Sequence, residues 1–85
     1  MSRGFPSLPN IEFLIDGNGE ITIGRVGPAH CAATACNDHQ ALAMLVRRDD
    51  ESLEQLLVRL EKAIENAIEE EIFIDEINQG RNGRI

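Results

Sequence analysis

The 85-residue chain contains no tryptophan and no tyrosine, and its aromatic residues are the three phenylalanines Phe5, Phe13 and Phe73. Its hydrophobic core must therefore be built from isoleucine, leucine, valine and alanine. A chain of this length forms one domain near the lower size limit for independent folding. Because small domains with thin cores often gain stability by self-association, we expect a homodimer.

Long apolar runs are also missing, since no stretch approaches the roughly 20 residues that a membrane-spanning helix needs. The first residues, Met-Ser-Arg-Gly-Phe-Pro, contain no hydrophobic signal region. Two cysteines, Cys31 and Cys36, do not make the disulfide framework of a small secreted domain. These features predict a cytoplasmic protein with no membrane partner.

Basic residues are outnumbered by acidic ones, and the net charge is −7. The excess lies in residues 49–78, where eleven acidic residues stand against two basic ones, whereas residues 1–48 are balanced. A surface of this sign repels phosphates, so direct nucleic-acid binding is not expected. A basic protein partner would be attracted. The simpler alternative is that the negative charge only keeps the domain soluble.

The proline and glycine pattern divides the chain into an extended N-terminal arm over residues 1–10, a single domain over residues 11–78 and a flexible tail over residues 79–85. Within the domain, the alternating apolar residues of 11–15 and 20–26 flank the turn sequence Asp-Gly-Asn-Gly. This pattern predicts a β-hairpin.

The middle of the chain is alanine-rich and harder to assign. Residues 41–47 form a short apolar run closed by two arginines and are interpreted as a strand, with a helix as the rival assignment. Residues 29–36 would then form another strand, although alanine is a poor strand former.

The strongest local signal is a helix that begins after Ser52 and runs to about residue 70. Ser52 and Gln55 have the spacing of a capping box. Apolar residues then recur every three or four positions, at Leu53, Leu56, Leu57, Leu60, Ile64, Ala67 and Ile68. Residues 72–74 are β-prone, but a turn or a helix extension fits them equally well. The predicted fold is therefore α+β: a three- to four-stranded antiparallel sheet packed on one long C-terminal helix.

One cluster of reactive side chains precedes this helix, namely His30, Cys31, Cys36 and His39. Four such ligands can complete a tetrahedral zinc site, which makes a small metal-binding protein an alternative function. Against it, Cys31 and Cys36 lie five positions apart and would point to opposite faces of a strand. The plain interpretation is two small buried cysteines and two surface histidines.

No recognisable catalytic pattern is present, and we expect neither enzymatic activity nor a cofactor. Cys36 and His39 are spaced like a nucleophilic dyad, but nothing in the sequence indicates an activating environment or an oxyanion hole. The glycine pairs lack the lysine and the following helix of a phosphate-binding loop.

The acidic C-terminal half contains the residues expected to meet a partner. These are Glu61, Glu65, Glu69, Glu70, Asp75 and Glu76. We interpret them as a docking surface for a basic protein, in a non-enzymatic interaction or regulatory module. A solvated helix face is the plain alternative. A further alternative is mimicry of nucleic acid, in which spaced carboxylates occupy a nucleic-acid-binding protein.

Overall fold

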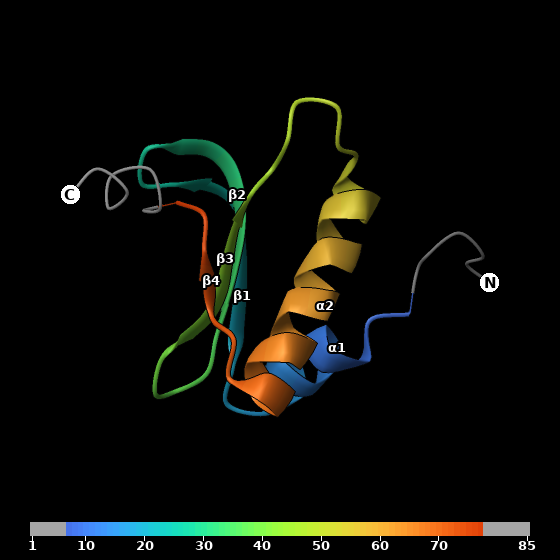
Figure 1. The fold of residues 1–85 in the computed structure, drawn as a ribbon, viewed down its shortest axis with the longest axis vertical. Coiled ribbons are helices and arrows are strands. Elements are labelled where there is room, and N and C mark those ends of the chain that lie inside the picture. Colours follow the sequence, from blue (N-terminus) through green and yellow to red (C-terminus); the bar gives the residue numbers. More distant parts are fainter. Residues whose placement is uncertain (1–6, 78–85) are drawn as a thin grey trace.

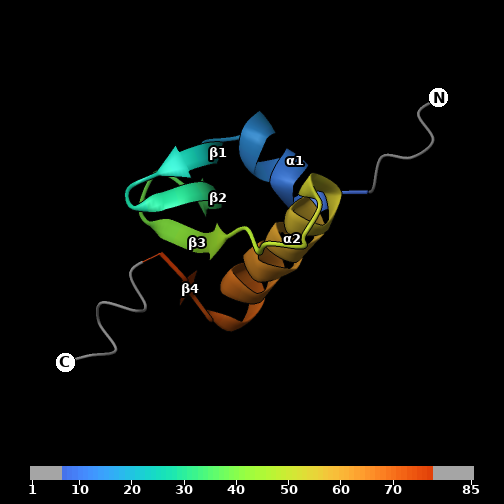
Figure 2. The ribbon, with the colours of Figure 1, turned by 90° about the horizontal axis from the view of Figure 1, so that it is seen from above.

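The computed structural model describes residues 7–77. Two helices lie on one side of a four-stranded sheet, as Figures 1 and 2 show. The elements, in chain order, are α1 (Pro9–Asp16), β1 (Glu20–Val26), β2 (Ala29–Cys36), β3 (Ala41–Val46), α2 (Leu53–Glu70) and β4 (Ile74–Asp75). The α+β prediction is confirmed, including the long C-terminal helix.

The first element differs from the prediction, because residues 11–15 belong to helix α1 and not to a hairpin strand. Pro9, assigned from the sequence to the extended arm, stands in the first turn of the helix, where its missing N–H costs nothing. Ile11 and Leu14, three positions apart, are buried side by side in the core. The alternation of Ile11, Phe13 and Ile15 suggested a strand. A helix instead buries Ile11 and Leu14 against the core, which forms only in the tertiary fold.

The hairpin lies one element later, between β1 and β2, and turns at Gly27 with a φ of 56°. The strand predictions for residues 29–36 and 41–47 are confirmed, with β3 ending at Val46. The strand order is β1-β2-β3-β4. The short β4 pairs parallel with β3, which corrects the fully antiparallel sheet that we predicted. The reason is the connection, since a helical crossover returns the chain in the same direction.

The core lies between the sheet and α2. Ala33 and Ala35 of β2 face the helix side and are fully buried together with Leu45 of β3 and Leu60 and Ile64 of α2. Alanine is tolerated in β2 because its small side chain leaves room for the helices to approach the sheet closely. The apolar stripe of α2 therefore packs into the core through Leu56, Leu60, Ile64 and Ala67, whereas Leu53 and Ile68 are about half exposed.

Helix α2 begins as the sequence predicted. The hydroxyl of Ser52 accepts from the N–H of Gln55 at 3.1 Å, and the Gln55 side chain accepts from the Ser52 N–H at 2.9 Å. The helix ends at Glu70, and the C-cap residue Glu71 adopts the left-handed conformation with φ 55°. The predicted tail over residues 79–85 lies outside the described residues.

Candidate functional site

The structure does not bring the four predicted zinc ligands together. His30 and Cys31 are neighbours near the start of β2, so their side chains leave opposite faces of the sheet. Cys36 ends the same strand, and five residues of strand span about 16 Å. Within residues 7–77 no group of three or more histidine, cysteine or carboxylate side chains is placed to hold a metal ion.

The Cys36–His39 dyad also lacks a supporting contact. The Cys36 thiol lies 4.0 Å from the carbonyl oxygen of Glu20, and the imidazole of His39 lies 3.4 Å from the carboxylate of the exposed Asp38. Neither contact joins a thiol to an imidazole, so the geometry gives no reason to assign a nucleophile.

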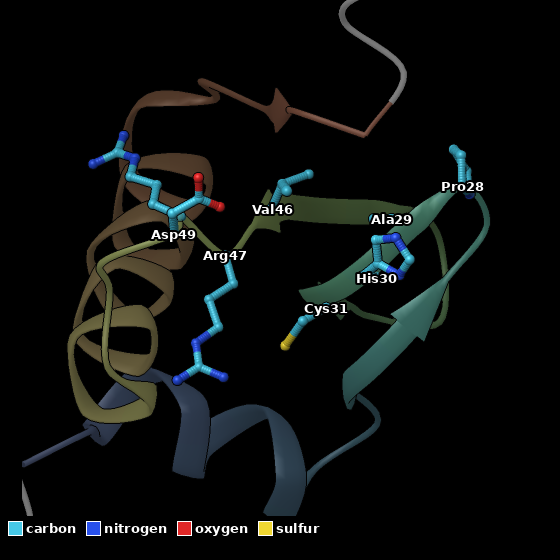
Figure 3. A pocket seen from close by; sticks show the side chains of 8 residues that line it. Pro28, Ala29, His30, Cys31, Val46, Arg47 and Asp49 are labelled. Carbon is cyan, nitrogen blue, oxygen red and sulfur yellow. The ribbon is translucent and has the colours of Figure 1, made fainter.

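A shallow hollow lies at the end of the sheet where His30 and Cys31 are found. Its volume is about 630 Å³, and Arg47, Arg48 and Asp49 of the β3–α2 loop line its other side. In Figure 3 the Cys31 sulfur points toward the side of the hollow that holds the Arg47 guanidinium, and the His30 ring lies apart from both. Because basic and acidic side chains stand together here, the hollow has no single charge that would select a ligand.

Two of the six predicted docking acids have structural roles instead. Glu61 of α2 accepts the backbone N–H groups of Asn10 and Ile11 at 2.8–3.0 Å and the Asn10 side-chain amide at 2.6 Å. Its carboxylate thus caps the N-terminus of α1, where the orphan N–H groups and the helix dipole favour a negative charge. This contact fixes α1 against α2.

Glu76 is the second, and it belongs to a network around Arg59. One carboxylate oxygen of Glu76 accepts the Val46 N–H at 2.9 Å, and the other accepts from the Arg59 guanidinium at 3.1 Å. Arg59 also donates to the Val46 carbonyl at 2.9 Å. The network joins α2, the end of β3 and the segment after β4.

The same guanidinium forms a two-pronged ion pair with Glu51, which is only 8% exposed. The distances are 2.7 Å from Nε and 3.0 Å from Nη2 of Arg59. The hydrogen bond from Arg59 outweighs the opposing effect of burial and, with the Arg48 N–H, lowers the pKa of Glu51 to about 2. In return, the bond to Glu51 raises the pKa of Arg59.

Sequence reasoning missed the roles of Glu51 and Arg59. From the sequence, Glu51 is simply one of the eleven acidic residues of 49–78. The available signal was that Arg59 has no acid four residues before it, since that position is Gln55. An arginine without a helical partner is a candidate for a long-range ion pair.

The other predicted acids remain on the surface. Glu65 lies 3.6 Å from Lys62 with its side chain 40% exposed, and Glu69, Glu70 and Asp75 are exposed. At 100° per residue, Glu61, Glu65 and Ile68 lie on the flank of α2 that faces α1. The acids that can still meet a partner are therefore near the C-terminal end of α2.

Between that end of α2 and α1 lies a cleft of about 410 Å³, here called the α1–α2 cleft. Its apolar side chains are Phe13, Leu14, Leu42 and Ile68, and the rest of the lining comes from the neighbouring turns, Gly17–Gly19 and Asn37–Asp38. Leu42 and Leu14 are buried, whereas Phe13 is 69% and Ile68 is 48% exposed. The β2–β3 register shift helps to form this lining, because Leu42 is the extra residue of β3 and turns into the core.

Comparison with protein-family models, curated proteins and solved structures finds no match for this chain. Neither helix among residues 7–77 has the length and apolarity to cross a membrane.

Proposed function

We propose that this domain is a non-enzymatic protein-interaction module that binds a basic, amphipathic segment of a partner protein in the α1–α2 cleft. The observation that supports the proposal is an apolar cleft, lined by Phe13 and Ile68, on an acidic domain. Its acidic surface and its two free cysteines fit a cytoplasmic module that acts through a protein partner.

The exposed side chain of Phe13 supports an interaction site at the cleft. The chain contains three phenylalanines, and in a domain with so few aromatic residues a phenylalanine would be expected to stabilise the core. Instead Phe13 is 69% exposed beside Ile68. Adjacent exposed apolar side chains over a concave surface are typical of an interaction site.

The charge around the cleft determines the kind of partner. Asp38 belongs to the lining, and Glu65 lies three positions before Ile68 on the same flank of α2. An amphipathic helix can insert apolar side chains into such a groove while its lysines and arginines meet the acidic rim. Because Glu61 and Glu76 are hydrogen-bonded inside the fold, the docking surface proposed here relies on the acids next to the cleft, Glu65 and Asp38.

The test is direct binding of a labelled model peptide, measured by fluorescence anisotropy. The probe is a leucine–lysine amphipathic helix of about 18 residues, which is about five turns. We expect Ile68→Glu to weaken binding by about tenfold, or about 1.4 kcal/mol, because the charge would lie in the apolar lining. Val58→Glu is the matched control, since Val58 is 47% exposed on the same helix but does not line the cleft.

Both variants add one negative charge, so nonspecific attraction of the cationic peptide would be equal in the two proteins. Equal affinity of the Ile68→Glu and Val58→Glu variants would therefore reject the cleft as the binding site. Equal binding of a leucine–glutamate peptide would reject the preference for a basic partner. Affinity for the basic peptide should fall as salt rises from about 0.05 M to about 0.5 M.

A further inference from the structure

Strand β1 is an edge of the sheet, and its outer side has no strand partner among residues 7–77. Edge strands of natural proteins are usually protected by lysine, proline, a short length or a bulge. Here Glu20–Val26 contains neither lysine nor proline, and its bulge follows Gly24. The strand is regular from Glu20 to Ile23, before Gly24 with its φ of 139°, and this stretch has an edge able to pair with another strand.

Apolar side chains lie next to this edge on the helix side of the sheet. Ile23 pairs with Ala33, a core residue on the helix side, and is 43% exposed. Ile15 of α1 is 59% exposed and, at 100° per residue, points about 160° away from Phe13, which lines the cleft. Figure 2 shows α1 beside the β1 end of the sheet. Ile15 is therefore on the flank of α1 opposite the one that lines the cleft through Phe13.

We propose that a second copy of this chain pairs antiparallel with β1 along this edge, joining two four-stranded sheets into one of eight strands. A two-fold axis perpendicular to the sheet keeps all helices on one side and brings the two α1 helices next to each other. The same contact then pairs the open backbone of β1 and covers Ile15 and Ile23. This inference does not rest on the α1–α2 cleft, which opens on the other flank of α1.

The residues of β1 favour one register. Directly opposite residues in an antiparallel pair have their side chains on the same face of the sheet. The two-fold axis must therefore pass midway between the two copies of one residue, which lie opposite each other. Centred on Thr22, the pairing places Ile21 opposite Ile23 of the second copy, an apolar pair on the helix side. It also brings the Glu20 end of one strand beside the Arg25 end of the other. Centred on Ile23, it would place Ile21 opposite Arg25.

A second copy is the occupant that the geometry favours because the edge is complementary to itself in this register. Isologous pairing of one strand with its own copy is the simplest closed assembly. It also enlarges the apolar core of a domain whose buried side chains are mostly alanine and leucine.

Native mass spectrometry and light scattering of the full chain test the assembly. The unmodified protein should be a dimer, and Ile23→Lys should be monomeric because a lysine on the edge opposes pairing. Val58→Lys is the control, since Val58 has similar exposure on α2 and should leave the dimer intact. A monomeric unmodified protein, or an Ile23→Lys variant that stays dimeric while its circular dichroism is unchanged, would overturn the proposal.

Cross-linking tests the register in a Cys31→Ser/Cys36→Ser background. Thr22→Cys should oxidise to a covalent dimer, because opposite Cα atoms lie about 4.5–5.5 Å apart, within disulfide range. Ile23→Cys should not, since the two copies of residue 23 are then diagonal neighbours about 7–8 Å apart. Cross-linking at residue 23 but not at residue 22 would reject this register.

Discussion

Glu51 is the residue whose chemistry the fold alters most. Its carboxylate is nearly buried, yet it remains ionised because Arg59 donates two hydrogen bonds to it and the Arg48 N–H donates a third. A buried carboxylate without these donors would favour its neutral form. The β3–α2 loop is thus held to the helix by a charge, and the loop conformation depends on that charge.

We expect Glu51→Gln to lower the free energy of unfolding by about 2 kcal/mol, since it removes charge-assisted bonds and leaves Glu76 as the acidic partner of Arg59 among residues 7–77. Urea denaturation at neutral pH measures this loss. Glu54→Gln is the control, because Glu54 is an exposed acid in the first turn of the same helix. An equal effect of both substitutions would contradict the assigned role.

The pH dependence follows from the same ion pair. Because folding lowers the pKa of Glu51 from 4.5 to about 2, its contribution is complete above pH 4.5 and is lost as the pH falls toward 2. The unfolding free energy of the unmodified protein should therefore decrease more over this interval than that of the Glu51→Gln variant. Parallel curves for the two proteins would contradict the lowered pKa.

Gly19 shows at the residue scale how a sequence signal can be interpreted for the wrong reason. In the sequence it completes Asp-Gly-Asn-Gly and indicates a tight hairpin turn. In the structure a Cβ at this position would meet the Leu14 side chain at 2.7 Å and the Cys36 carbonyl oxygen at 3.0 Å. The glycine is therefore needed for the close approach of α1 to the sheet.

Among the elements, α1 depends most on its surroundings. It has eight residues, a length at which an isolated helix is not stable in water. Its N-cap, Leu8, provides no side-chain hydrogen bond, and the cap comes from Glu61 on α2. Helix α2 in contrast contains its own capping box and its own apolar stripe, which is why the sequence alone predicted it.

Removing the Glu61 carboxylate should therefore loosen α1 before the rest of the domain. We expect Glu61→Ala to cost about 1 kcal/mol and to speed amide hydrogen exchange in α1, while exchange in α2 changes little. Glu65→Ala, one turn later and paired only at the surface with Lys62, is the matched control. Uniform acceleration across the whole domain would show that Glu61 does not act through α1.

At the scale of the whole molecule, the arrangement of the strands decides the zinc hypothesis. The ligands are spread along β2 and the following turn, so we expect excess zinc to change neither the native mass nor the melting temperature. Native mass spectrometry with and without zinc checks this. One zinc per chain, lost on Cys31→Ala or Cys36→Ala, would instead show that residues 30–39 rearrange around a metal.

The two proposed surfaces, the α1–α2 cleft and the β1 edge, lie on different parts of the molecule. The α1–α2 cleft lies on one flank of α1, and the β1 edge lies on the other. A dimer formed through β1 would leave both clefts open, so peptide binding and self-association should be independent. Loss of peptide binding would therefore leave the dimer unaffected, and loss of the dimer would leave peptide binding unaffected.

The sequence by itself determined the elements whose signals are local: the capping box and apolar stripe of α2, and the alternating or short apolar strands β1, β2 and β3. It also determined the acidic charge and the small aliphatic core. The tertiary structure alone decided that residues 11–15 form a helix, that β4 runs parallel to β3, and that Glu51, Glu61 and Glu76 act inside the fold. The physical reason is that each of these depends on a partner in another element: Glu51 binds Arg59 eight positions along the chain, and the others depend on partners 17 to 51 positions away. Glu61 and Asn10, which meet at 2.6 Å, are 51 positions apart.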